Sequence, residues 1–354
     1  MKKLVILGGG YGGMAIVRQL LERDLPPDTV IYLVDRMPYQ GLKTEYYALA
    51  AGSAAEHRLH VAFPVHPHLI LFFGEVTEIS LKEKLVYLQD QDPISYDWLV
   101  IGLGCVDQYY GIPGAPEFTH SLQSLGAARR TYVALQEVRP YGHVTIIGGG
   151  LSGVEMASEL RECRPDLHIR ILDRGGGILA AFPEKLRLFV HEWFLEHDVE
   201  IRSHVELEDI RETEILEGGK VLRSEATVWA GGIQPAHPVQ ALEVNKDEAG
   251  RIRLDSFHRI PQFPEVFVVG DCASLVFSPS AQAAIIQGKQ IATVVRAIWD
   301  GVTPNISPLR LRGTLGSLGK KNGFALMGDS TVVVGKVPRT LKSGVLWKSR
   351  HHFG

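Results

Sequence analysis

The sequence predicts an α/β fold that contains two Rossmann-like dinucleotide-binding units, and two observations support it. A short apolar run, Leu4–Leu7, precedes a glycine-rich turn near the start, and a similar run, 143–147, precedes another one far downstream. The glycines have GxGxxG spacing, as Gly8, Gly10 and Gly13 in the first turn and Gly148, Gly150 and Gly153 in the second. A strand, such a turn and a helix together cradle a pyrophosphate, because the glycines permit a close approach and the helix N-terminus attracts negative charge. Two copies therefore predict two bound dinucleotides.

In the first unit, apolar residues at helical spacing predict a helix after Gly13, and Pro26 and Pro27 end it. The next strand, 30–34, ends in Asp35, 22 residues after Gly13. An acid at about this distance binds a ribose hydroxyl of the dinucleotide. An ordinary turn residue at a strand end is the alternative interpretation of Asp35.

The second unit repeats this order. A helix is expected over 151–164, and the strand 168–172 ends in Asp173, 20 residues after Gly153. An acid at this position favours a free 2′-hydroxyl and therefore NADH over NADPH, although Arg174 beside it weakens that preference.

The chain then returns to the first unit. A buried-type strand, 266–269, leads into Gly270-Asp271-Cys272-Ala273, and a helix is expected over 280–299. The second unit is thus inserted in the first. The expected boundaries are 1–110 together with 251–310 for the first domain, 111–250 for the second, and 311–354 for a C-terminal segment.

Composition places the chain among globular proteins. It has 354 residues, 45% of them hydrophobic, and no apolar run of the length that spans a bilayer. Three separated cysteines form no CxxC pair, and the histidines at 57, 60, 66 and 68 lack the spacing of a known metal site, so no metal is expected. The segment from Arg310 onward holds nine Lys or Arg and one acid, whereas the whole chain carries a net charge of −3. That asymmetry favours a basic face that meets an anionic surface.

These motifs together resemble the two-dinucleotide-binding flavoproteins, and within them the type II NADH dehydrogenases, which are single-subunit NADH:quinone oxidoreductases. The closer marks are the run Gly8–Gly13, the stretch Ala281-Gln282-x-Ala284, and the run Gly313–Gly319. The resemblance covers nearly the whole chain. It implies FAD in the first domain, NADH in the second, hydride transfer between them, and a quinone such as menaquinone or ubiquinone as the acceptor.

The resemblance also implies roles for individual residues. The implied FAD contacts are Gly8, Gly10, Gly13, Asp35, Lys43 and Asp271. The implied NADH contacts are Gly148, Gly150, Gly153 and Asp173. The implied catalytic residues are Glu155, Gln282 and Gln287. Two of these have structural alternatives, since Asp271 could cap a helix and Glu155 could be an acid favoured in a first helical turn.

The sequence departs from the family on the acceptor side. Ile286 replaces the first glutamine of the family's Gln-Gln pair, the loop 42–47 lacks the usual motif, and the C-terminal helices are missing. Pro338 and Gly344 weaken a helix in the basic remnant, which could still bind anionic lipid.

Other functions therefore stay open. The alternatives are a reductase of a soluble acceptor and a flavin-bearing NADH sensor with little turnover. Sulfide:quinone oxidoreductase is disfavoured by the cysteine positions, and nucleic-acid binding has no motif. We expect a cytoplasmic protein. Two further partners are considered, the inner face of the cell membrane and a second copy of the chain as a homodimer.

Overall fold

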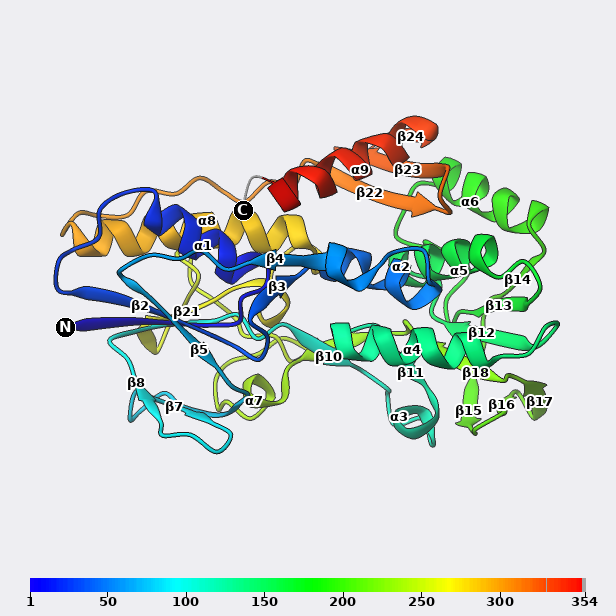
Figure 1. Cartoon of the computed structure of the whole chain (residues 1–354), viewed down its shortest axis with the longest axis horizontal. Coiled ribbons are helices and arrows are strands. Elements are labelled where there is room, and N and C mark those ends of the chain that lie inside the picture. Colours follow the sequence, from blue (N-terminus) through cyan, green and yellow to red (C-terminus); the bar gives the residue numbers. More distant parts are fainter. Residues whose placement is uncertain (329, 352–354) are drawn as a thin grey trace.

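The structure is a computed structural model that describes residues 1–328 and 330–351, with side chains described up to Trp347. Asp329, the side chains of Lys348 and Arg350, and residues 352–354 of the basic segment lie outside this part. Figure 1 shows an elongated molecule with one sheet toward each end and a C-terminal helix lying along one side. No helix in the described ranges is both long and apolar enough to cross a bilayer.

The first sheet combines strands from both ends of the sequence. Its order is β20-β21-β9-β1-β2-β5, and all neighbours are parallel except the β20–β21 pair at one edge. The strands are β1 (Lys2–Leu7), β2 (Thr29–Asp35), β5 (Leu69–Phe73), β9 (Trp98–Ile101), β20 (Arg259–Ile260) and β21 (Phe263–Val268). The strands from 259–268 thus complete a sheet begun by residues 2–101.

Alternation along β1 gives this sheet two buried faces. Leu4 and Ile6 pack in one cluster with helices α1 (Tyr11–Leu21) and α8 (Ala281–Trp299). Val5 and Leu7 point to the opposite face, into a cluster with a small antiparallel sheet. That small sheet consists of β6 (Val76–Ser80), β7 (Leu85–Leu88) and β8 (Ile94–Ser95). A two-residue side-chain period with both faces apolar is typical of a central parallel strand.

The second sheet is entirely parallel, with the order β11-β18-β12-β13-β14. Its strands are β11 (His120–Ser121), β12 (His143–Ile147), β13 (His168–Leu172), β14 (Val199–Arg202) and β18 (Ala226–Trp229). Helices α4 (Leu125–Glu137), α5 (Leu151–Cys163) and α6 (Glu184–Glu196) contribute to its core. Strand β12, the turn at Gly148 and helix α5 follow one another in the order that the sequence predicts.

Short elements connect and extend these two bodies. The helices are α2 (Tyr46–Ala51), α3 (Ala115–Phe118) and α7 (His237–Gln240), with single turns η1 (Lys43–Glu45), η2 (Glu56–Leu59) and η3 (Gly270–Cys272). The strands are β3 (Tyr39–Gly41), β4 (His60–Ala62), β10 (Cys105–Asp107), β15 (Leu207–Ile210), β16 (Glu214–Glu217), β17 (Lys220–Arg223) and β19 (Ile233–Pro235). Figure 1 shows α2 lying between the two sheets.

The C-terminal segment is more ordered than the sequence suggested. Strands β22 (Gly313–Leu318), β23 (Asn322–Met327) and β24 (Thr331–Gly335) form an antiparallel sheet, and helix α9 (Lys336–His351) packs on it. A helix forms here although Pro338 and Gly344 were expected to weaken it. Pro338 is the third helical residue, where the N–H has no partner within the helix in any case. Packing on the sheet stabilises a helix that has weak intrinsic propensity.

Close packing between α1 and α8 provides a test of this fold. A Cβ on Gly288 of α8 would lie 2.5 Å from the carbonyl oxygen of Gly12 and 3.1 Å from the Cβ of Ala15. We expect Gly288→Ala to lower the free energy of unfolding by about 1–3 kcal/mol, because the helices must separate. Gly344→Ala is the matched control, since no atom beyond its own helix backbone lies within 4 Å of the place that a Cβ would take. It should stabilise α9 by about 0.5–1 kcal/mol. Urea unfolding of both variants measures the difference, and equal effects would contradict the close helix contact.

Candidate functional site

The first glycine turn has a geometry that only glycine can adopt. Gly8 has a φ of 100°, and a Cβ there would overlap the carbonyl oxygen of Gly102. A Cβ on Gly13 would overlap the carbonyl oxygen of Gly8, so the turn and α1 touch through their backbones. The space beside Gly10 is open to 4 Å, and no side chain caps α1 at this residue. The first N–H groups of α1 therefore face an open cradle that suits a pyrophosphate.

The second turn repeats this arrangement. Gly148 has a φ of 108°, and its Cβ would overlap the carbonyl oxygen of Ala230. A Cβ on Gly153 would overlap the carbonyl oxygen of Gly148, while the space beside Gly150 is open. Gly150 caps α5 without a side-chain hydrogen bond, and the first turn of α5 contains no acid. Both predicted turns thus form a cradle of the kind that a dinucleotide phosphate fits.

The two strand-end acids also occupy equivalent positions. The Gly9 N–H donates to Asp35 Oδ2 at 2.6 Å, and the Gly149 N–H donates to Asp173 Oδ2 at 2.7 Å. The second oxygen of each carboxylate accepts the N–H of a residue two positions further on, at 2.8 and 2.7 Å. Each carboxylate therefore stabilises the glycine turn beside it through its backbone hydrogen bonds. A carboxylate oxygen has two lone-pair sites, so a ribose hydroxyl can still be bound. Burial raises the pKa of Asp35, although the backbone donors oppose this shift.

A second group of polar residues lies where η1, β10 and η3 come together. The Lys43 ammonium, in η1, donates to Cys105 Sγ at 3.0 Å and lies 3.6 Å from Asp271 Oδ2. The Cys105 thiol, in β10, donates to the same Asp271 oxygen at 3.1 Å. Burial would lower the pKa of Lys43, but Cys105 and Asp271 outweigh burial and raise it. Burial raises the pKa of Cys105 to about 12. The group therefore holds a charged lysine and a neutral thiol at pH 7.

The structure brings Lys43 and Asp271 together and adds Cys105 to them. The capping alternative for Asp271 was wrong, because α8 is capped by Ser280, whose side chain accepts the Ala283 N–H at 3.1 Å. Asp271 lies in η3, nine residues earlier in the chain. Sequence reasoning assigned no role to Cys105, because no CxxC motif or other pattern around it indicated one.

The two glutamines of α8 lie in different environments. Gln287 is fully buried, and its amide binds the backbone around Asp271 by accepting the Gly270 N–H at 2.9 Å and donating to the Val268 carbonyl at 3.0 Å. It therefore orders the turn that carries Asp271. Gln282 is partly exposed, and its Oε1 accepts the Arg312 N–H at 2.6 Å. The structure thus places Gln282 and Gln287, for which the resemblance implies the same catalytic role, in different environments.

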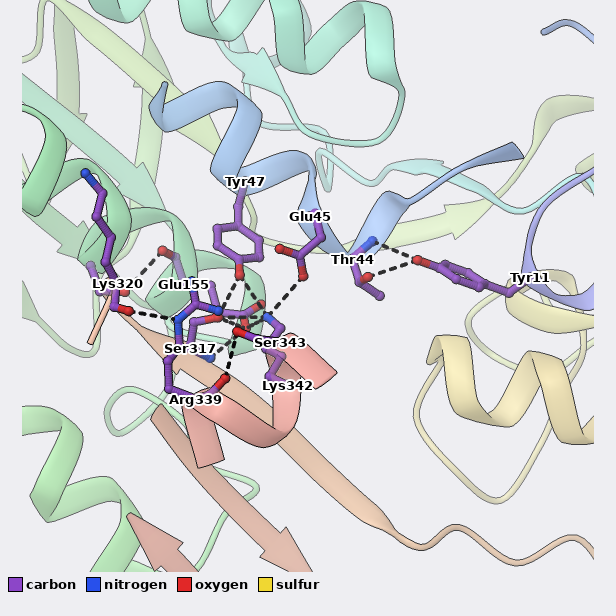
Figure 2. A network of polar contacts seen from close by, with 11 residues as sticks. Tyr11, Thr44, Glu45, Tyr47, Glu155, Ser317, Lys320, Arg339, Lys342 and Ser343 are labelled. Carbon is purple, nitrogen blue, oxygen red and sulfur yellow. Dashed lines mark hydrogen bonds and ion pairs between the residues drawn. The ribbon is translucent and has the colours of Figure 1, made fainter. Parts of the chain in front are cut away.

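Glu155 belongs to a network that the sequence did not indicate. The Lys342 ammonium, from α9, lies 2.5 Å from Glu155 Oε1, and it donates to Tyr47 Oη and Ser317 Oγ at 2.9 Å each. It is also 3.7 Å from Glu45 Oε1. Figure 2 shows this ammonium among the side chains of Glu45, Tyr47, Glu155 and Ser317, which come from distant parts of the chain. Glu155 Oε1 further accepts the Ser317 N–H at 2.8 Å.

Burial makes this network electrostatically strong. The Lys342 side chain is 11% exposed and the Glu155 side chain 7%. Burial would lower the pKa of Lys342, but Glu155 and the neighbouring groups outweigh it and raise the pKa far above the ordinary value of 10.5. Burial raises the pKa of Tyr47 and of Glu45. The ammonium is consequently held charged at the junction of α2, α5, β22 and α9. Glu155 lies beyond the first turn of α5, so the alternative of a dipole-favoured first-turn acid was wrong.

The matches to known proteins agree with this geometry. The model of the pyridine nucleotide-disulphide oxidoreductase family matches residues 2–301. The NADH dehydrogenase-like protein YutJ of Bacillus subtilis is 48% identical over the full length of both chains. The type II NADH:quinone oxidoreductase of Staphylococcus aureus is 24% identical over 94% of this chain and 91% of its own.

One solved structure shares the whole architecture. NDH2 of Plasmodium falciparum, in complex with NADH, superposes with a TM-score of 0.84 and 16% sequence identity, over 99% of this chain and 96% of that chain. At this identity the likeness concerns the fold. The family match and the Bacillus relative decide the classification, and this chain belongs to the pyridine nucleotide-disulphide oxidoreductases, flavoprotein enzymes that use NAD(H).

Proposed function

We propose that the chain is an FAD-dependent NADH dehydrogenase that delivers electrons to a quinone. In this proposal residues 1–110 and 251–310 bind FAD, residues 111–250 bind NADH, and 311–354 contact the acceptor side. The observation that carries the proposal is the pair of equivalent glycine cradles, joined by the buried Glu155–Lys342 contact between them. Hydride acceptance and onward electron transfer are the chemistry that a bound flavin supplies.

The first cradle is proposed to hold FAD. Gly10 and the uncapped start of α1 would receive its pyrophosphate, and Asp35 its ribose. Asp271 and the Lys43 ammonium would contact its more distant part, since η1 and η3 face each other across this end of the sheet. Lys43 provides a fixed positive charge there, which stabilises negative charge that develops on a neighbouring group.

The second cradle is proposed to hold NADH. Gly148, Gly150 and Gly153 permit the approach of its pyrophosphate, and Asp173 would bind a ribose hydroxyl. Glu155 is five residues beyond Gly150 on α5, on the side of this cradle that faces α2 and the first sheet. We therefore keep Glu155 as the proposed acid near the reacting groups.

Lys342 extends this proposal to the acceptor. A quinone gains negative charge as it is reduced, so a fixed positive charge held in the site would stabilise the reduced form. Lys342, Tyr47 and Ser317 form one hydrogen-bonded network around Glu155. Because the pKa of Lys342 is raised far above 10.5, the ammonium keeps its proton and would act as a fixed positive charge in this network.

Three features support the proposed acceptor. The Staphylococcus relative is named a quinone oxidoreductase. Gln282 is proposed as a polar contact for the quinone, whereas Gln287 is proposed to position Asp271. Helix α9 exposes Val337 and Leu341, by 62% and 50%, in a basic segment, which suits contact with an anionic membrane surface.

A soluble acceptor is the second candidate function. Ile286 stands where the family carries a glutamine, and the amide of Gln287 is bound within the protein. A quinone would therefore meet fewer polar groups than in the family. A flavin-bearing NADH sensor with slow reoxidation is the remaining alternative, and neither candidate requires a homodimer.

The choice of acceptor can be measured in steady state. FAD-loaded protein is mixed with NADH and a menaquinone analogue, ferricyanide or oxygen, and NADH oxidation is followed. We expect the quinone rate to exceed the oxygen rate clearly, and NADPH to be a poor donor because Asp173 repels a 2′-phosphate. Ferricyanide is the control for a competent flavin. Fast ferricyanide reduction with a negligible quinone rate would favour the soluble acceptor, and slow reoxidation by all three would favour the sensor.

Membrane contact can be tested by co-sedimentation. The protein should bind anionic vesicles at low salt through the basic C-terminal segment and be released at high salt, because added ions screen the attraction. Neutral vesicles are the control. Equal partition to anionic and neutral vesicles would contradict an electrostatic contact.

The Lys342 network gives a prediction on stability. Lys342→Met leaves Glu155 buried without its cation and should cost about 3–5 kcal/mol in urea unfolding. Adding Glu155→Gln should recover part of that loss, because the unpaired charge is removed. Lys336→Met, at an exposed position of the same helix, should change stability by less than about 0.5 kcal/mol. Additive losses in the double variant would contradict a direct pair.

The raised pKa of Lys342 also fixes a pH dependence. A group whose pKa is higher in the folded state contributes stability fully below its unfolded value and loses it as the pH rises further. The stability difference between the wild-type protein and Lys342→Met should therefore be constant between pH 7 and pH 10 and shrink above 10.5, the ordinary value of a lysine. A difference that shrinks already near neutral pH would contradict the assignment.

A further inference from the structure

An exposed stacking contact lies at the carboxyl end of the second sheet. The guanidinium carbon of Arg174 is 4.9 Å from the ring centroid of Tyr110, which is the distance of a cation–π interaction. Arg174 follows β13, and Tyr110 follows β10 and is 49% exposed. Within the described ranges no carboxylate forms an ion pair with Arg174, so the ring of Tyr110 is its principal partner.

The order of the sheet shows what this contact crosses. Tyr110 is held on the β18 side, because the Gln108 N–H donates to the carbonyl of Gly232, and a Cβ on Gly232 would meet the Tyr110 hydroxyl. Arg174 stands on the β13 side. Strand β12 lies between β18 and β13, and all three are parallel, so their carboxyl ends share one edge. The contact therefore spans the end of β12, where the Gly148 turn begins.

This is the edge of the sheet at which the second cradle opens. In parallel sheets of this kind, a dinucleotide lies in the crevice outside the carboxyl ends of the strands. The Tyr110–Arg174 contact joins the two sides of that edge, across the end of the central strand. A dinucleotide placed over the Gly148 turn would have to pass the line that joins the two side chains.

The backbone conformation of Tyr110 determines the direction of its side chain. Tyr110 has a φ of 54°, in the left-handed region that bulky residues rarely adopt. The Gln108–Gly232 hydrogen bond and the turn that joins the Ile112 N–H to the Tyr109 carbonyl at 3.0 Å impose this conformation. The conformation directs the ring of Tyr110 toward Gly232 and Arg174.

We propose that Tyr110 and Arg174 form a strap that closes the NADH crevice in the free protein and opens when the dinucleotide binds. This inference rests on the proposed function, because it takes the second cradle as the NADH site. The closed strap lowers the apparent affinity for the dinucleotide, since only the open fraction binds. An exposed cation–π contact favours the closed form by a modest factor, so the strap tunes affinity without blocking access.

The test is a mutant cycle on dinucleotide binding. NAD⁺ is titrated by calorimetry into the FAD-loaded protein, which avoids turnover. Tyr110→Ala should bind NAD⁺ about three- to six-fold more tightly than the wild type, because the closed form is lost. Tyr110→Phe retains an aromatic face and should match the wild type. Tyr141→Ala, at a residue that is 75% exposed before β12, is the control for loss of a surface tyrosine.

The second arm of the cycle isolates the pair. In an Arg174→Ala background, Tyr110→Ala should have no further effect on the NAD⁺ dissociation constant, whatever Arg174 itself contributes to binding. Equal or weaker binding by Tyr110→Ala, in a variant whose thermal unfolding matches the wild type, would overturn the strap. A wild-type protein that binds no NAD⁺ and is not reduced by NADH would instead overturn the proposed function.

Discussion

The structure depends on a close backbone approach that is made twice. At Gly13 and again at Gly153, the first helix of each unit touches the carbonyl oxygen of the residue that opens the turn, Gly8 or Gly148. Any side chain there would separate the helix from its strand. Because the turn and the helix fit so closely, the open space beside Gly10 and Gly150 lies directly at an uncapped helix N-terminus. That combination of a tight contact and an adjacent open cradle is the geometry on which the two proposed phosphate sites depend.

The two cradles are joined by a third body that has no dinucleotide motif of its own. The antiparallel sheet β22–β24 and helix α9 carry Ser317 and Lys342 to Glu155. Tyr47 and Glu45, from the end of the chain that builds the first cradle, complete the surroundings of the ammonium. A buried ion pair is costly to desolvate, and complete hydrogen bonding of this kind is what offsets the cost. The basic C-terminal segment is therefore packed into the molecule at Glu155 as well as exposed at the surface.

Sequence patterns predicted the parts of the fold that depend on local rules. Glycine spacing, strand length and the two strand-end acids are set within about 35 residues, and the structure has them where the patterns placed them. The contacts between distant segments could not be predicted in this way. Lys342 lies 187 positions from Glu155, and nothing in its neighbours indicates burial. Gln287 illustrates the reverse case, since its polar side chain suggested a ligand but binds the backbone of its own protein.

We propose that this chain brings NADH to a flavin held in the first cradle, and that the strap at Tyr110 and the charge at Lys342 adjust that event. The most direct measurement is an anaerobic titration of the FAD-loaded protein with NADH, followed in the visible absorption band of the flavin. We expect the band to bleach as NADH is added and NAD⁺ to appear in equal amount. A flavin that stays oxidised in excess NADH would contradict it.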